Sequence, residues 1–333
     1  MNALSVLDRS PRLMESVSRV LNKRGDKFLF GGVERTAPIA SNPSAATGVH
    51  TAVPHKYLYA YLTAAKSFLR YQEDVAVYVH DDGSLTAEDK QLIRRHIPGA
   101  KVIDRAWADS EFAKRVNDEF LSKVRGSYTS YLKLFDPTLV STNERILIVD
   151  TDVLFLKEPA EIMKWTGSGG SSWYHRSGPW KKPNGHAPTP GEAVAAPAPQ
   201  APQKHIQQLV VESIPAINGA LGTSYEFVHG FNSGLIGYDR GTIDYKRLKA
   251  LLNHLFGLFG ERIFRWGSEQ TMHGLVLCGS GAQALPMDKY MVYTEVSSGQ
   301  ARAAHFVHFI GEFRYHQMLY PRLAREVIHQ LNH

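Results

Sequence analysis

Patterns typical of β-strands and α-helices alternate along the chain from Gly48 onward. Short apolar runs bounded by turn residues predict strands at 49–53, 75–80, 101–103, 145–149, 225–238, near 285 and at 304–309. Apolar residues at helical spacing predict helices at 57–70, 86–96, 110–124, 128–135, 245–259 and 321–331. Such alternation is typical of a mostly parallel sheet flanked by helices. We therefore expect an α/β fold.

The chain has 333 residues, which suits one large domain or two closely packed ones. Residues 48–333 carry the alternating pattern and are expected to form the main domain. Residues 1–47 are expected to form an N-terminal extension, with an amphipathic helix at 10–24 and a loop at 31–47. The basic face of that helix could rest on an anionic membrane surface, or the helix could dock on its own domain.

A proline-rich stretch interrupts the main domain at about 167–205. Seven of the 17 prolines fall between Pro179 and Pro202, where large apolar residues are almost absent. This composition predicts a flexible surface insertion. A lid over an active site is the alternative, because the stretch follows an acidic strand end closely.

Several classes of protein do not fit the composition. No apolar run reaches the ~20 residues of a membrane helix, and charged residues such as Arg9 and Arg12 stand where a signal peptide would be apolar. The single cysteine, Cys278, can form neither an internal disulfide nor a cysteine-based metal cluster. We therefore expect a soluble, cytoplasmic protein. The 38 Lys and Arg exceed the 32 Asp and Glu by six, but no nucleic-acid-binding motif accompanies this charge.

Two aspartates, Asp150 and Asp152, follow the buried strand at 145–149. Open α/β sheets bind ligands at the carboxyl ends of their strands, so both carboxylates should lie in that crevice. Two neighbouring negative charges repel unless a cation compensates them. Mn²⁺ or Mg²⁺ is the natural candidate because both prefer oxygen ligands and share them with phosphates. Acidic residues that only cap a turn are the plain alternative.

A second polar group ends a late apolar strand, in the run HFIGEFR. His308 can offer a neutral nitrogen to a metal, Gly311 allows close backbone approach, and Arg314 carries a fixed charge for phosphate oxygens. A histidine on an apolar strand is often structural, but the three residues together suit a diphosphate site.

Four motifs occur in one order along the chain: ILIVDTDVLFLKEP, GFNSGL, WGSEQTMHGLV and HFIGEFR. This ordered set resembles that of GT-A nucleotide-sugar glycosyltransferases, in particular the retaining, glycogenin-like family 8 group. The resemblance covers residue 48 to about 320, apart from the proline-rich stretch. It implies a Mn²⁺-dependent (or Mg²⁺-dependent) retaining hexosyltransferase that uses a nucleotide sugar, a UDP-sugar by the resemblance, and a glycan, lipid-linked or protein acceptor.

The resemblance implies that Asp150, Asp152 and His308 bind the metal. Arg314 stands where the family has a lysine that holds the phosphates, and Lys133 matches a position that the family usually fills with arginine. Both substitutions keep the positive charge and change its geometry.

The resemblance also implies a donor site. Asn232 and Ser233 would line the sugar pocket, and Gln270, with Glu269 beside it, would face the donor sugar. The further residues that it places near the nucleotide sugar are Thr51, Tyr57, Asp82 (or Asp81) and Thr151. Glu269 could act as a nucleophile, or it could be a first-turn acid of a helix.

Two other functions stay open from the sequence. The chain could be a catalytically silent module of the same fold that only binds nucleotide sugars or glycans. It could also bind nucleic acid through its basic surface, with an affinity that falls steeply with salt. The intact set of metal-binding residue types favours the enzyme.

Overall fold

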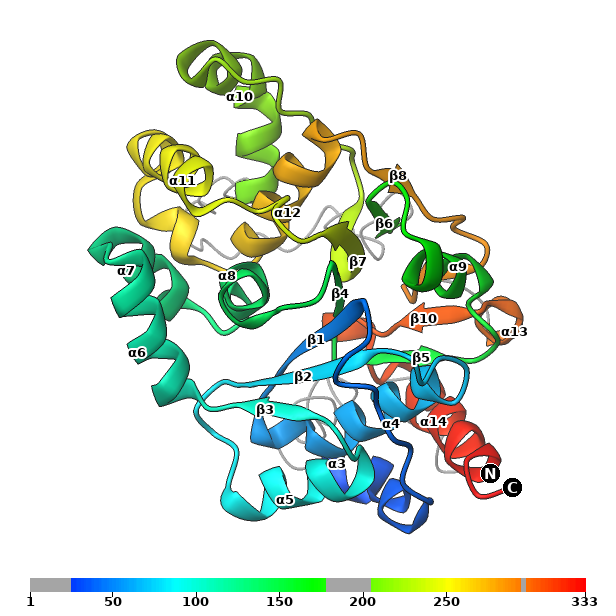
Figure 1. The fold of residues 1–333 in the computed structure, drawn as a ribbon. Helices are drawn as coiled ribbons and strands as arrows, with labels where there is room; N and C mark the ends of the chain where they lie inside the picture. The colour runs from blue at the N-terminus through cyan, green and yellow to red at the C-terminus, as the bar shows by residue number, and fades with distance from the viewer. Residues whose placement is uncertain (1–24, 178–204, 295–297) are drawn as a thin grey trace, which may run out of the picture.

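The computed structural model describes residues 25–177, 205–294 and 298–333. Its larger sheet consists of β1 (Thr47–Val53), β2 (Ala76–Asp81), β3 (Lys101–Ile103), β4 (Arg145–Val149), β6 (Trp173–Arg176), β7 (Phe231–Asp239) and β8 (Gln283–Ala284). Its smaller sheet consists of β5 (Val153–Phe155), β9 (Tyr290–Val292) and β10 (Phe306–His308). The strand orders are β3-β2-β1-β4-β7-β6-β8 and β5-β10-β9 (Figure 1).

The larger sheet is mostly parallel. β1 pairs in parallel with β2 and β4, β2 with β3, and β6 with β8. β7 is antiparallel to both of its neighbours, β4 and β6. The expected α/β class, a mostly parallel sheet flanked by helices, is thus confirmed.

The helices cover both faces of this sheet (Figure 1). They are α3 (Asp26–Phe30), α4 (Leu58–Leu69), α5 (Ala87–His96), α6 (Arg105–Val116), α7 (Glu119–Ser127), α8 (Tyr131–Val140), α9 (Ala160–Ser168), α10 (Ile206–Leu221), α11 (Tyr245–Phe259), α12 (Ser268–Gly279), α13 (Ser298–Ala303) and α14 (Leu319–Gln330). Helix α8 packs on β1 and α12 packs on β7, while α4 lies against β5 on the opposite side.

Strand β4 separates two apolar cores because its residues alternate between faces. Leu147 and Val149 join the core that contains the α4 side chain Leu62. Ile146 and Ile148 join the core beneath α8, α11 and α12. Strand β4 is buried on both faces, so it divides the molecule into two halves, one around each of these cores. Asp150 follows the carboxyl end of β4 and lies between the two halves.

A third apolar core joins the smaller sheet to α3, α4 and α14. Within that sheet, β10 runs antiparallel to β5, with His308 opposite Val153. The pairing brings the late part of the chain beside the segment that follows Asp150. Helix α14 packs on α3 and α4, so the last described helix lies against the first (Figure 1).

Several local predictions were wrong. The helix expected at 110–124 is two helices, α6 and α7, because Asn117 adopts a left-handed conformation with φ 47°. The helix expected at 128–135 is α8, which begins at Tyr131 and continues through Pro137 to Val140. A proline there removes one backbone donor, while the Ser141 amide still donates to the Pro137 carbonyl.

Other differences concern the second half of the chain. Strand β7 begins at Phe231 rather than at 225, and α10 was not predicted. Strand β6 lies within the range 167–205 that was expected to be a flexible insertion. The expected N-terminal helix at 10–24 and most of that insertion lie outside the described residues.

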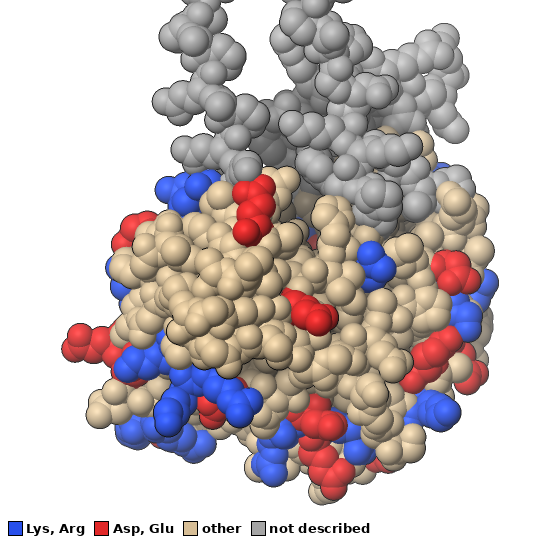
Figure 2. All heavy atoms as spheres, turned by 90° about the horizontal axis from the view of Figure 1, so that it is seen from above, with Lys and Arg blue, Asp and Glu red and all other residues tan. Residues whose placement is uncertain are grey.

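Charged side chains are mixed on the surface. On the described surface in Figure 2, Lys and Arg stand among Asp and Glu along the lower edge, and the middle is largely uncharged. No helix within the described ranges is both long and apolar enough to cross a bilayer.

Candidate functional site

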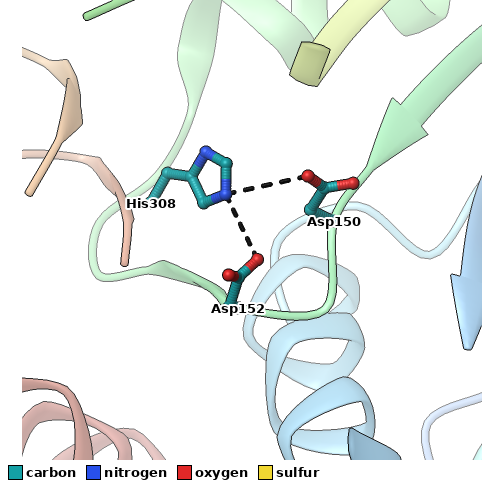
Figure 3. A group of neighbouring side chains, drawn as sticks. All are labelled: Asp150, Asp152 and His308. Atoms are coloured by element: carbon teal, nitrogen blue, oxygen red, sulfur yellow. Dashed lines mark hydrogen bonds and ion pairs between the residues drawn. The ribbon is translucent and has the colours of Figure 1, made fainter. Parts of the chain in front are cut away.

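Asp150, Asp152 and His308 come together at the end of β4 (Figure 3). His308 Nε2 lies 3.2 Å from Asp152 Oδ1 and 3.7 Å from Asp150 Oδ2. One ligand atom from each residue lies within 4.8 Å of the other two. Pairing of β10 with β5 produces this geometry, and the Phe309 amide fixes it by donating to the Asp152 carbonyl over 2.8 Å.

Two cations flank the carboxylates. Lys133 Nζ lies 2.7 Å from Asp150 Oδ1, and Arg314 donates to Asp152 Oδ2. Burial alone would lower the pKa of Lys133, but the carboxylates of Asp150 and Glu269 outweigh it and raise that pKa. The pKa of Arg314 is likewise raised, since Asp152 outweighs the effect of burial. Both side chains therefore carry a full positive charge in the site.

Each aspartate thus divides its two oxygens between different partners. The outer oxygens, Asp150 Oδ1 and Asp152 Oδ2, face Lys133 and Arg314. The inner oxygens, Asp150 Oδ2 and Asp152 Oδ1, face His308 Nε2. Burial would raise the pKa of Asp152, but Arg314 and His308 outweigh it and hold that pKa well below its usual range. Asp152 is therefore a carboxylate at neutral pH.

The inner atoms are a plausible set of ligands for a divalent cation. Two carboxylate oxygens and one imidazole nitrogen suit Mn²⁺ or Mg²⁺, and three protein ligands leave coordination positions for phosphate oxygens and water. Within the described ranges, this is the one group of at least three His, Cys, Asp or Glu side chains arranged closely enough to hold a metal.

Residues of β7 and α12 form the next part of the site. Ser233 Oγ donates to Glu269 Oε2 over 3.2 Å, and the Ser233 amide donates to Gln270 Oε1 over 3.3 Å. Glu269 Oε1 accepts from His273 Nδ1 over 2.6 Å, and Lys133 Nζ lies 3.7 Å from Oε2. Burial would raise the pKa of Glu269, but Lys133 and His273 outweigh it and lower that pKa. Glu269 is a buried carboxylate with both oxygens engaged.

An irregular pairing aims these β7 residues into the site. Tyr174 of β6 pairs with Ile236, whereas the next residue, His175, pairs with Asn232. The three residues in between, 233–235, therefore form a bulge in β7, and bulges often redirect side chains near functional sites. His175 Nδ1 lies 3.3 Å from the Leu235 carbonyl of this bulge. Burial, then His308, lowers the pKa of His175 well below its usual range, so the neutral ring donates this bond.

Gly234, at the centre of the bulge, makes room for His308. A β-carbon on Gly234 would come closer than 3.0 Å to both Cε1 and Nδ1 of the His308 ring. Neither Gly234 nor His175 was predicted from the sequence to take part in the site. Gly234 belongs to the GFNSGL motif, and this motif could have indicated that it lies at the site. No sequence pattern around His175 connects that residue to the site.

The site opens into a cavity of about 840 Å³ between the two halves of the molecule. Most of the predicted residues line it, namely Tyr57, Asp82, Lys133, Asp150, Thr151, Asp152, Asn232, Ser233, Glu269, Gln270, His308 and Arg314. Two do not. Thr51 is buried and lines a separate, smaller cavity, and Gly311 lies in a turn next to the wall with φ 43°. Asp81 also points elsewhere, because it accepts from the amides of Gly83 and Leu85.

Tyr57 and Arg314 form one wall of the cavity. The guanidinium carbon of Arg314 lies 4.6 Å from the centre of the Tyr57 ring, which is within the range of a cation–π contact. Arg314 belongs to this wall and not to the outer surface, because its side chain is only 12% exposed.

Comparisons with known proteins agree with this architecture. No family profile matches the sequence, and no curated protein matches it. Among solved structures, the bifunctional glycosyltransferase WbbM has 12% identity and a TM-score of 0.52 over 87% of this chain and 51% of that one. The chain therefore spans about half the length of WbbM and shares its fold.

Two further similar structures have lower TM-scores. The galactosyltransferase LgtC, in complex with donor and acceptor sugar analogues, has 13% identity and a TM-score of 0.45, over 84% of this chain and 95% of that one. Core-mannan synthase A from Aspergillus fumigatus, in a Mn/GDP form, has 9% identity and a TM-score of 0.43, over 78% of this chain and 76% of that one.

Proposed function

We propose that the protein is a metal-dependent glycosyltransferase that moves a sugar from a nucleoside-diphosphate sugar to a hydroxyl acceptor. One observation carries the proposal. Asp150, Asp152 and His308 direct three ligand atoms toward one point, while Lys133 and Arg314 hold the outer carboxylate oxygens. A diphosphate bound to a cation at that point would lie next to both basic side chains.

The chemistry follows from where charge develops. When the bond between the anomeric carbon and the phosphate breaks, negative charge grows on the leaving nucleoside diphosphate. Asp150, Asp152 and His308 would hold a divalent cation, which would supply part of the compensating charge. Lys133 and Arg314 supply the rest by exchanging part of their contact with the aspartates for phosphate oxygens.

Retention of the anomeric configuration is part of the proposal. It would arise from a same-face reaction in which a departing phosphate oxygen accepts the proton of the acceptor hydroxyl. The alternative, attack by Glu269 on the anomeric carbon, has less support. Both Glu269 oxygens are already engaged, by His273 on one side and by Ser233 and Lys133 on the other. A carboxylate so engaged is a weaker nucleophile.

The donor is a UDP-sugar in this proposal, by the resemblance of the motifs, and the metal is Mn²⁺ or Mg²⁺. A thermal-shift screen of UDP- and GDP-sugars, with and without Mn²⁺, identifies the donor. A ligand at 100 times its dissociation constant stabilises the folded state by about 2.7 kcal/mol. Transfer of a labelled sugar from that donor then separates an enzyme from a silent binding module. Mn²⁺-dependent stabilisation without transfer or donor hydrolysis would favour the binding module.

Asp152→Asn tests the proposed metal site, because it removes the negative charge of one ligand and hardly changes the volume of the side chain. We expect it to abolish Mn²⁺-dependent binding of UDP in calorimetry, and turnover, while the protein stays folded. Asp288→Asn is the matched control, since Asp288 is exposed and does not line the cavity. Undiminished metal-dependent binding in Asp152→Asn would disprove the metal assignment.

A further inference from the structure

The cavity has two ends of different character. Tyr57 and Asp82, which follow β1 and β2, line one end together with Lys56. Trp266, which precedes α12, lines the other end. Because β4 lies between β1 and β7 in the sheet, and α12 packs on β7, these ends lie on opposite sides of Asp150. A nucleotide bound at the first end therefore leaves the second end for another ligand.

Trp266 is held in place although it is largely exposed. Its side chain is 68% exposed at the cavity wall. The ring of His205 packs against it edge to face, with ring centres 5.2 Å apart at an angle of 71°. Gly267 makes this possible, because a β-carbon there would overlap the His205 ring and because its φ is 88°. A supported, exposed indole offers a flat apolar surface to a ligand.

Helix α10 provides hydrogen-bonding groups beside this surface. Gln207, Gln208, Val211 and Glu212 line the cavity with helical spacing, so one side of α10 faces it. Gln207 Nε2 has no hydrogen-bond partner among the described residues. A buried amide nitrogen without a partner favours a ligand that can accept from it.

The charges at this end indicate what kind of ligand fits. The basic side chains on the cavity wall are Lys56, Lys133 and Arg314, and in the described structure none of them belongs to the end formed by α10 and Trp266. That end therefore suits a neutral ligand better than a phosphate. A sugar ring has an apolar face of C–H groups and a rim of hydroxyls, which match an aromatic surface flanked by amide and carboxyl groups.

We propose that Trp266 and the cavity-facing side of α10 form the binding site for the acceptor, and that the acceptor presents a neutral pyranose ring which stacks on Trp266. The proposal rests on the proposed function, because it assigns a second substrate to the same cavity. Trp266 binds the ring face, His205 holds the indole, and Gln207 donates to a ring hydroxyl. The acceptor hydroxyl then lies between this end and the donor sugar held near Gln270.

Saturation-transfer NMR tests the site without requiring turnover. The probes are methyl glucoside, galactoside, mannoside and xyloside, each with UDP and Mg²⁺ present. We expect at least one of them to receive saturation from the wild-type protein, mainly at protons on one ring face. Trp266→Ala should abolish this signal and Trp266→Phe should keep most of it. Trp107→Ala is the matched control, because Trp107 is also exposed but lies on α6, outside the cavity wall.

Kinetics with the identified donor provide a second test. Loss of the aromatic surface should raise the KM for the acceptor by about tenfold in Trp266→Ala, which corresponds to about 1.4 kcal/mol. Donor hydrolysis without acceptor, and UDP affinity, should stay unchanged. Equal pyranoside signals in wild type and Trp266→Ala, or no pyranoside signal in the wild type, would overturn this inference alone. A wild type that neither binds UDP nor consumes any nucleotide sugar would overturn the proposed function.

Discussion

Arg314 allows a sharp test at the scale of a single residue. Its guanidinium pairs with Asp152 and lies over the Tyr57 ring. If it holds the diphosphate, Arg314→Ala should weaken UDP binding by at least tenfold in the presence of Mn²⁺, because a charge-assisted hydrogen bond contributes about 1.5–3 kcal/mol. Turnover should fall further, because the charge on the leaving group grows in the transition state. Calorimetry with UDP and Mn²⁺ measures the first effect.

Arg314→Lys is the conservative comparison. It restores the charge but not the two-pronged geometry, so it should recover much of the UDP affinity. Equal UDP affinities in wild type and Arg314→Ala would remove Arg314 from the diphosphate site.

Gly234 gives a second prediction at this scale. In Gly234→Ala the new methyl group must displace the His308 ring, because the two would overlap. We expect Mn²⁺ affinity to fall by at least tenfold and the free energy of unfolding to fall by about 1–3 kcal/mol, as for other overpacked sites. Gly257→Ala is the matched control, since nothing lies within 4 Å of a β-carbon there. Wild-type Mn²⁺ affinity in Gly234→Ala would mean that His308 is not a ligand.

How far the site could be predicted depends on the kind of signal each residue carries. Asp150 and His308 lie at strand ends within motifs, so their chemistry and their convergence could be expected. His175 could not be found, because its role depends on an irregular pairing between two strands that no local pattern encodes. Thr51 was misplaced because alternation along β1 turns its side chain toward α4 instead of the cavity.

At the scale of elements, Asp26 connects α3 to α4. Its carboxylate accepts from the backbone amides of Tyr59 and Ala60 in the first turn of α4, over 2.7 Å and 2.9 Å. Burial raises the pKa of Asp26 to about 7, and these amides and Arg314 offset only part of that effect. In the unfolded chain the same carboxyl group has a pKa near 3.9.

The sign of the pH dependence follows from this difference. Between about pH 4 and pH 7 the folded protein keeps a proton on Asp26 that the unfolded chain has lost, so stability falls as pH rises. From pH 5 to pH 6.5, the free energy of unfolding of the wild type should fall by about 2 kcal/mol more than that of Asp26→Asn. Urea titrations at the two pH values measure these free energies of unfolding, with Asp288→Asn as the control. Parallel changes in wild type and Asp26→Asn would contradict the shifted pKa.

Two helices that contain a proline depart from the prediction, because α8 ends later than expected and α10 was not expected. Helices α8 and α10 contain Pro137 and Pro215 within their bounds, and both continue past them. Their buried apolar sides, with Leu134 on α8 and Val210 on α10, pack in the same core. Packing of that kind offsets the loss of one backbone hydrogen bond. In contrast, α11 matched its predicted bounds, because its apolar spacing is regular and Asp244 caps its start.

At the scale of the whole molecule, the proline-rich stretch permits a prediction from composition. Residues 183–203 contain almost no large apolar side chain, so they can contribute little to the free energy of folding. Deletion of 183–203 should leave the melting temperature within about 2 °C of the wild type, and a glycine-serine replacement of the same length should behave alike. A fall of several degrees in both variants would show that these residues pack on the domain.

The arrangement of layers was the most predictable property of the molecule. Alternating strands and helices define the α/β class by themselves, because parallel neighbours need crossovers. The reversed direction of β7 was not expected, although it places Asn232 and the bulge beside Asp150. Strand direction depends on long-range pairing, which local patterns do not contain.

The pairing of β10 with β5 has a consequence for synthesis on the ribosome. β1, β2 and β4 can form their parallel core once residues up to about 150 have emerged, since domains tend to fold from the N-terminus during translation. Asp150 and Asp152 are then present without their third partner. Only when His308 emerges can it pair opposite Val153 and complete the ligand set. A nascent chain that stops before His308 therefore lacks one of the three candidate metal ligands, and the full set forms only after β10 has been translated.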